Sequence, residues 1–250
     1  MRTKTLGIGF GLICLLFISV QMQEQGQSNL ALNLTVERKA LSLGEPVNLR
    51  FELKNNGSDD LTILDAFGTG TGFLTVHISE DGKNYTQHEA GWGSIDLINA
   101  KTHVKRGESI VAKATVLWQR KGTDSQFTFT EPGVYFLKAK YNVTIDGKNH
   151  NIILESDPIE ITVTEPDGAD LTIWRKIKSN GNIAYLLERN DMKIPSYNVK
   201  ERAKFQKLVE SIILEYPNSS FATSLNLSFR RFLENEELTR AAKEQRTTNQ

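Results

Sequence analysis

The chain has 250 residues, of which 39% are hydrophobic and 24% charged, and its 30 basic and 30 acidic residues cancel. This length allows one large domain or two modest ones, and the composition is that of a soluble globular protein. The balanced charge gives no support for nucleic acid or an anionic membrane as a partner.

The N-terminus predicts an export signal. Arg2 and Lys4 precede an uncharged apolar run at 6–20, and a polar, glutamine-rich stretch follows. Such a run suits a signal peptide and is short for a membrane span. We assign 1–28 to a signal peptide and polar spacer and expect the protein in the periplasm, at the cell surface or secreted. No clear small-x-small cleavage site follows, so an uncleaved leader that anchors the chain in a membrane stays open.

Cys14 is the only cysteine of the chain. A mature protein without it has no disulfide, no thiolate metal ligand and no cysteine nucleophile. A small animal ectodomain would more often carry disulfides, so an exported bacterial protein fits better. A lipoprotein signal requires a small residue at the position of Ile13, so the sequence argues against lipidation of Cys14.

Between 29 and 165 the chain alternates apolar and polar residues, as strands with one buried face do. The segment "VNLRFELKNNG" places every second residue from Val47 to Leu53 on one apolar face, namely Val47, Leu49, Phe51 and Leu53. The segment "SIVAKATVLWQ" does the same with Ile110, Ala112, Ala114, Val116 and Trp118. We therefore predict a mainly β domain, an antiparallel sandwich, over 29–165, with Trp118 in its core.

From 166 the spacing becomes helical, and we predict an α-helical region over 166–236. Its main helix carries an apolar stripe from Phe205 to Tyr216, and a second helix follows Pro217 with a cap among 218–220. Two shorter helices precede them. Trp174 is expected to pack this region against the strands. The segment 237–250 has no apolar stripe and is predicted to be a disordered tail.

Two resemblances carry these assignments further. The segments "LSLGEPVNLRFELKNNG", "EPGVYFLKAKY" and "SDPIEITV" resemble strands of bacterial immunoglobulin-like sandwiches of the proteinase-inhibitor-like or adhesive type. The resemblance implies that the Tyr135 hydroxyl ties down a corner of the sandwich, and it transfers no activity. The segment "ILEYPNSSFATSLNLSFRRFL" resembles a single tetratricopeptide-like helical hairpin.

The tetrapeptide "DGKN" occurs at 81–84 and again at 146–149. A helix-loop-helix calcium site needs a glutamate at the last loop position, where these copies have His88 and Ile153. The alternating segments on both sides instead predict type I′ hairpin turns.

No other motif predicts chemistry. The "GTGTG" stretch at 68–72 lacks the spacing and the following helix of a dinucleotide-binding loop. The four histidines show no zinc-ligand spacing, and no Gly-x-Ser-x-Gly elbow occurs. We predict no catalytic, cofactor-binding or metal-binding residue and a protein that is not an enzyme.

Counting one chain reversal at each turn gives a map of the loops. It places Asn56 and both "DGKN" tips at one end of the sandwich. The other end receives 68–72, Trp92, the loop 120–131 and the start of the helices. Loops that gather at a domain junction are a common place for binding sites.

Four residues at this second end are the candidate ligand- or partner-binding residues: Trp92, Gly70, Phe73 and Arg120. Trp92 stands between two glycines, where its ring is available to stack on a sugar or to anchor a partner protein. The competing interpretation is that this ring covers one edge of the sandwich.

The predicted function is protein–protein interaction or scaffolding at the cell envelope by a non-catalytic exported protein. One alternative is carbohydrate binding through Trp92 and neighbouring loops, with a glycan as partner. A second alternative is an inhibitor or accessory subunit of a secreted enzyme, which would use the loop 120–131.

Overall fold

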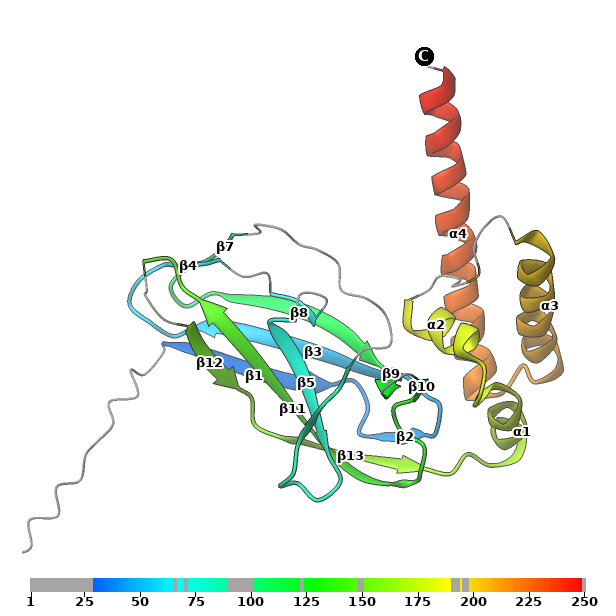
Figure 1. Cartoon of the computed structure of the whole chain (residues 1–250), viewed down its shortest axis with the longest axis horizontal. Coiled ribbons are helices and arrows are strands. Elements are labelled where there is room, and N and C mark those ends of the chain that lie inside the picture. Colours follow the sequence, from blue (N-terminus) through cyan, green and yellow to red (C-terminus); the bar gives the residue numbers. More distant parts are fainter. Residues whose placement is uncertain are drawn as a thin grey trace, which may run out of the picture.

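The structure is a computed structural model that describes residues 29–64, 67–69, 72–89, 101–121, 124–147, 151–189, 194 and 198–248, so the predicted leader lies outside it. The fold is mainly β, with several sheets and four C-terminal helices (Figure 1). The strands are β1 (Leu30–Val36), β2 (Ala40–Ser42), β3 (Val47–Asn55), β4 (Leu61–Ile63), β5 (Leu74–Ser79), β6 (Thr86–Gln87), β7 (Thr102–Val104), β8 (Ser109–Val116), β9 (Trp118–Lys121), β10 (Asp124–Phe127), β11 (Gly133–Thr144), β12 (Asn151–Glu155) and β13 (Ile159–Thr164). The helices are α1 (Gly168–Ile177), α2 (Gly181–Arg189), α3 (Val199–Glu215) and α4 (Ser220–Thr248).

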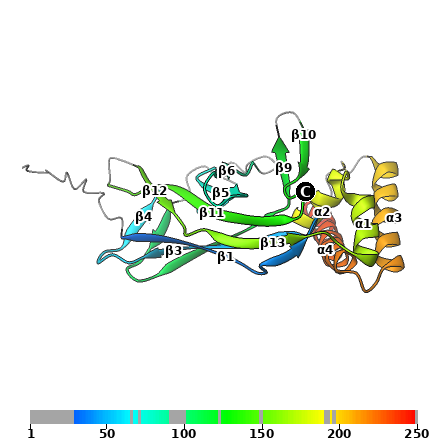
Figure 2. The same cartoon turned by 90° about the horizontal axis from the view of Figure 1, so that it is seen from below.

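The strands form two main sheets that lie one over the other (Figure 2). The smaller sheet has the order β1-β3-β8, and the larger has the order β2-β13-β11-β5-β6, with β12 also paired to β11. Every pair in them is antiparallel except β13–β2. The alternation of β3 explains the layering. Val47, Leu49, Phe51 and Leu53 bury their apolar side chains, while Asn48 and Arg50 between them are exposed.

Tyr135 makes the hydrogen bond predicted for it. Its hydroxyl donates to the carbonyl of Glu131 at 2.8 Å, and its ring lies edge-on to Phe129 with centroids 4.8 Å apart. The side chain is buried, so this bond fixes the entry of the chain into β11.

The helices form where the apolar stripes predict them. Phe205, Val209 and Ile212 are the buried residues of α3, which packs against α4. The hydroxyl oxygen of Ser219 accepts a hydrogen bond from the N–H of Ala222 at 3.2 Å and caps α4, as predicted. None of the described helices is long and apolar enough to cross a membrane.

Helix α4 continues to Thr248 and so differs from the disordered tail that the sequence predicts from 237. The absence of an apolar stripe there is real, because Leu238 is 69% exposed. The helix persists because Glu, Leu, Ala, Lys, Gln and Arg are strong helix formers. Its C-terminal turns project from the rest of the molecule (Figure 1).

A row of aromatic rings joins the helices to the strands, as predicted for Trp174, and Trp118 is buried, as predicted. The ring of Trp118 in β9 lies edge-on to Phe127 in β10 at 5.1 Å, and Phe127 lies edge-on to Trp174 in α1 at 4.9 Å. Gly44 allows this approach, since a Cβ atom there would lie 2.5 Å from the Trp174 ring. The position of the helices therefore depends on the strand layers.

The predicted map of the loops is wrong at one step. Strands β4 and β5 run in the same direction along β11, because Ile63 lies opposite Ile145 and Leu74 opposite Tyr141. The stretch that contains "GTGTG" therefore does not reverse the chain, although the count of turns assumes that it does.

The two "DGKN" tips consequently lie at opposite ends of β11. Gly82 lies near the start of this strand, where its Cβ position would be 3.4 Å from the Phe136 ring, and Gly147 follows the end of the strand. The hairpin β9–β10 does lie beside α2, as the map expects.

The first "DGKN" segment does not form the predicted type I′ turn, and the second lies partly outside the described residues. The ladders pair Ile78 with Thr86 and Thr144 with Asn151, which leaves a longer loop in both hairpins. The reversals are correct, but the type of the first turn is not, since Asp-Gly also suits longer loops that need a positive φ at the glycine.

Candidate binding groove

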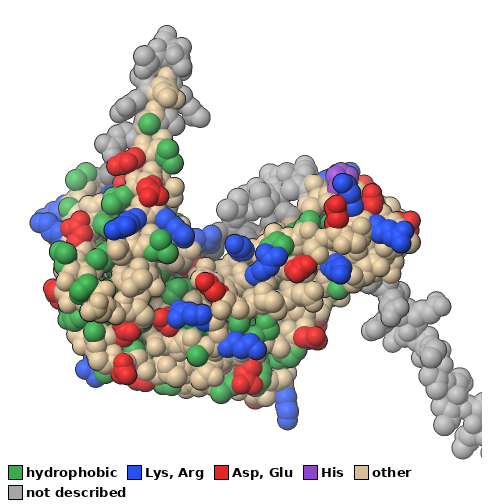
Figure 3. Space-filling model, turned by 180° about the vertical axis from the view of Figure 1, so that it is seen from behind, with side chains coloured by type: hydrophobic (Ala, Val, Ile, Leu, Met, Phe, Trp, Pro, Cys, Tyr) green, Lys and Arg blue, Asp and Glu red, His purple; other side chains and the backbone are tan. Residues whose placement is uncertain are grey.

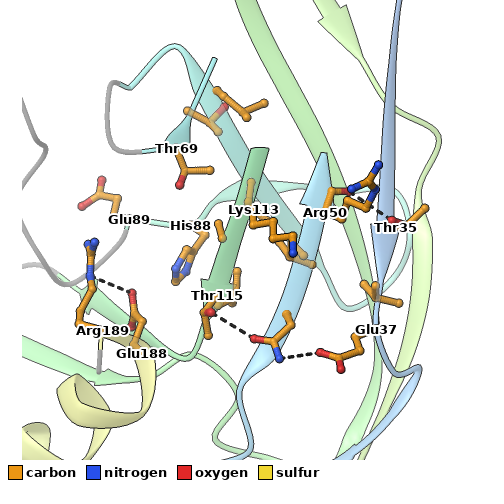
Figure 4. Close-up of a pocket in the computed structure, with 18 of the residues that line it drawn as sticks. Thr35, Glu37, Arg50, Thr69, His88, Glu89, Lys113, Thr115, Glu188 and Arg189 are labelled. Atoms are coloured by element: carbon orange, nitrogen blue, oxygen red, sulfur yellow. Dashed lines mark hydrogen bonds and ion pairs between the residues drawn. The ribbon is translucent and has the colours of Figure 1, made fainter. Parts of the chain in front are cut away.

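A groove with a volume of about 860 Å³ runs along β8. Its floor is the outer face of β1, β3 and β8, one wall is formed by β5 and β6, and the other by the end of α2 (Figure 4). Arg231 of α4 also lines it. Seen from behind, the molecule is hollowed between the projecting helix and the strand layers, with Lys and Arg side chains along the hollow (Figure 3). We call this surface the β8 groove. Its charged lining includes Arg50, Lys113, Glu89, Arg189 and Arg231, and His88 also lines it.

Strand β8 is an edge of its sheet, and its only ladder among the described residues is with β3. Two backbone hydrogen bonds fix the phase of this ladder. Asn55 donates to the carbonyl of Glu108 at 3.0 Å, and Gly107 donates to the carbonyl of Asn55 at 2.9 Å. Bonded and non-bonded pairs alternate along an antiparallel ladder, so these bonds determine which groups of β8 face β3.

The alternation leaves one set of backbone groups on the open side. Val111, Lys113 and Thr115 lie in the non-bonded pairs, so their N–H and C=O groups point away from β3 and along the groove. Ala112 and Ala114 turn their side chains toward the core but stay only partly buried. Such an edge is a template for pairing with another chain.

A ladder of side chains forms the floor of the groove. Thr115 donates to the Oδ1 atom of Asn48 at 3.1 Å, and Asn48 donates through Nδ2 to Glu37 at 2.8 Å (Figure 4). Beside this ladder, Arg50 lies directly opposite Lys113, and neither forms an ion pair with any carboxylate of the described residues. Like charges opposite each other are destabilising, so a bound anion would relieve this repulsion.

His88 lies on the other side of β8 from these cations (Figure 4). Both of its ring nitrogens are buried, and neither forms a hydrogen bond of good geometry with the described residues. Burial lowers the pKa of His88 from 6.5 to about 4, although Gln119 acts in the opposite direction. The ring is therefore neutral at pH 7.

The helices supply the last wall. Arg189 of α2 lies 3.9 Å from the carboxylate of Glu188, which is a loose ion pair. Arg231 is exposed on α4 and pairs with no carboxylate of the described chain. On the opposite wall Glu89 carries a negative charge, so the lining holds charges of both signs beside apolar residues and is most basic around Arg50 and Lys113.

The predicted binding residues flank this groove or lie outside the description. Trp92 and Gly70 lie outside the described residues. Phe73 and Arg120 do not line the groove, but Phe73 stands between two residues that do, and the N–H of Arg120 donates to the carbonyl of Glu89 at 2.9 Å. The sequence analysis missed Arg50 and Lys113, although the alternation of β3 and β8 marks both as outward-facing.

The acidic residue of the first "DGKN" copy has a structural role. The carboxylate of Asp81 accepts hydrogen bonds from the N–H groups of Lys83 and Asn84, both at 2.8 Å, and from the hydroxyl of Ser79. These donors hold the pKa of Asp81 well below its usual range. No cluster of metal-ligating side chains occurs in the described part of the chain.

No protein family and no curated protein matches the chain. Solved structures with a partial likeness include the CARDB domain of a Pyrococcus furiosus protein in complex with di-metal ions, which is 15% identical with a TM-score of 0.30 over 54% of this chain and 87% of that one. The sporulation control protein Spo0M of Bacillus subtilis is 14% identical with a TM-score of 0.32 over 59% and 54%. A β-glucosidase of Erythrobacter marinus is 14% identical with a TM-score of 0.31 over 54% and 15%. The chain spans about half or less of the latter two, and likeness at this level says nothing about function.

Proposed function

We propose that this chain is a non-catalytic binding protein, exported to the cell envelope, that acts by protein–protein interaction through the β8 groove. The observation that carries the proposal is the edge of β8, whose C-terminal half lines a concave surface. Along this edge the backbone groups of Val111, Lys113 and Thr115 face away from β3 and have no backbone partner among the described residues. A sheet edge of this kind is used by many proteins to hold a partner.

The proposal includes an immunoglobulin-like arrangement of the strands. Two features support it: the antiparallel order β1-β3-β8 facing a sheet built around β11, and the bond from Tyr135 to Glu131 at the start of β11. The tetratricopeptide-like interpretation of the helices has only the packed pair α3 and α4 behind it.

The alternatives have less support. Sugar sites commonly place the ring of Trp, Tyr or Phe under the ligand, and none of the described residues that line the groove is one of these three. Carbohydrate binding therefore rests on Trp92. Use of the loop 120–131 as an inhibitor rests on the hairpin β9–β10, whose base is held by the buried rings of Trp118 and Phe127.

Site-specific photo-cross-linking in the native host tests the proposal. A cross-linker at Val111, which is 42% exposed beside the groove, is expected to capture one discrete protein. The matched control is Ile153 on β12, which is 68% exposed and lies in the other sheet, away from β8. Capture of the same proteins from both positions, or of none from Val111, would contradict the proposal.

A further inference from the structure

We infer that the β8 groove takes an extended segment of its partner as an added strand, with apolar side chains toward the core and acidic side chains over Arg50 and Lys113. This inference rests on the proposed function and names the kind of partner. Three features of β8 support it among the described residues: the open backbone groups, the incompletely covered inner face and the unpaired cations on the outer face.

The backbone sets the geometry. The N–H and C=O groups of Val111, Lys113 and Thr115 repeat at every second residue, which is the spacing that an added strand matches. No hydrogen bond of the described residues outside the β3 ladder engages these groups. A partner strand would therefore gain main-chain hydrogen bonds along the middle of β8 without displacing any bond of the described chain.

The inner face of β8 calls for apolar partner residues. Ile110, Ala112 and Ala114 turn toward the core yet are only partly buried, whereas Phe51 and Leu53 of the adjacent strand are completely buried. A neighbouring strand would cover the exposed parts of these side chains, and every second residue of that strand would be apolar.

The outer face of β8 calls for acidic partner residues. Lys113 and the opposing Arg50 have no carboxylate partner among the described residues, and Arg231 extends the positive charge toward α4. Partner residues that alternate with the apolar ones would lie beside Lys113. Carboxylates there would offset the repulsion of the two cations, so the partner segment alternates apolar and acidic residues.

A nine-residue peptide that alternates valine and glutamate is the probe, and its binding to the full-length protein is measured by fluorescence anisotropy. Saturable binding is expected. Two further peptides carry N-methyl groups either on all the valines or on all the glutamates. Since only alternate N–H groups of an added strand face β8, one methylated peptide loses binding and the other keeps it. Equal binding of both peptides would overturn the inference, because charge alone would then hold them.

Matched variants test the charges. The double variant Arg50→Gln, Lys113→Gln is expected to bind the peptide about tenfold more weakly, whereas Lys54→Gln, on the same outer face of β3 but outside the groove, leaves binding unchanged. Binding that is unaffected by the double variant, or stronger binding of polygalacturonate than of the peptide, would also overturn strand addition.

The outcomes separate this inference from the proposed function. If Val111 captures a protein in the host but the alternating peptide does not bind, strand addition fails and protein binding at the groove stands. If the peptide binds but the cross-linker at Val111 captures no protein in the host, the proposed function fails.

Discussion

The ring of Phe127 lies edge-on to the ring of Trp174, with centroids 4.9 Å apart and planes at 78°. This contact joins the hairpin β9–β10 to the first helix, and α2 packs on the same hairpin. The helical wall of the β8 groove, with Arg189 and Arg231, is therefore held in place by aromatic packing remote from the groove floor.

The junction is sensitive to one glycine. Gly44 has a φ of 84°, and a Cβ atom there would lie 2.5 Å from the Trp174 ring, so Gly44→Ala is expected to lower the free energy of unfolding by about 3 kcal/mol. Gly147→Ala is the matched control, because φ is 77° but nothing lies within 4 Å, and it should cost about 1 kcal/mol. Urea unfolding measures both, and equal losses would mean that the ring moves aside without cost.

The corner at the start of β11 depends on one hydroxyl. Tyr135→Phe removes the bond to the carbonyl of Glu131 and keeps the ring, so it should destabilise the protein by about 1 kcal/mol. Tyr85→Phe is the comparison, since the Tyr85 hydroxyl is buried without a hydrogen bond to the described residues and its removal should not destabilise. Thermal unfolding measures the stability of both variants, and an equal loss of stability in the two would argue against the corner bond.

A buried amide connects the turn after β3 to β7. The side chain of Asn55 is fully buried, donates to the carbonyls of Asp59 and Val104 at 2.8 and 3.1 Å, and accepts from the N–H of Gly57 at 2.9 Å. Asn55→Ala leaves these groups unpaired and is expected to cost about 3 kcal/mol. Asn56→Ala provides the control in the same chemical denaturation series, because Asn56 is exposed. A loss below about 1 kcal/mol for Asn55→Ala would show that water replaces the amide.

His88 makes stability depend on pH. Above pH 6.5 its ring is neutral in the folded and the unfolded chain, but between pH 6.5 and about 4 only the unfolded chain gains the proton. The free energy of unfolding should therefore fall by up to about 3 kcal/mol over this window. His88→Phe is expected to reduce that slope and to leave the contribution of His77, whose pKa is also lowered by burial, while the exposed His103→Phe retains the full slope. Identical pH profiles of the wild-type protein and His88→Phe would refute the assignment.

The sequence predicted those features of the fold that depend on a local pattern of residues. The alternation of β3 and the stripe of α3 fixed their buried faces, and the resemblance to immunoglobulin-like strands implied the bond of Tyr135 to the backbone. The continuity of β4 and β5 along β11 could not be predicted, since an interrupted strand and a hairpin look alike when Gly-rich residues separate two apolar runs.

The groove was missed for a related reason. Arg50 and Lys113 lie 63 positions apart in the chain, and only the register of β3 with β8 brings them together. The burial of the His88 ring likewise depends on long-range packing. Loop motifs can be recognised in a sequence, whereas the candidate site consists of outward residues on regular strands and of a sheet edge.

The most direct test of the open β8 edge is site-resolved amide hydrogen exchange by NMR. In the free protein Ala112 and Ala114, whose N–H groups bond to β3, should exchange slowly, while Val111 and Lys113 exchange at least about tenfold faster. Addition of the alternating peptide should slow Val111 and Lys113 selectively. Equal protection of all four amides in the free protein would show that the edge is already occupied and would contradict the account.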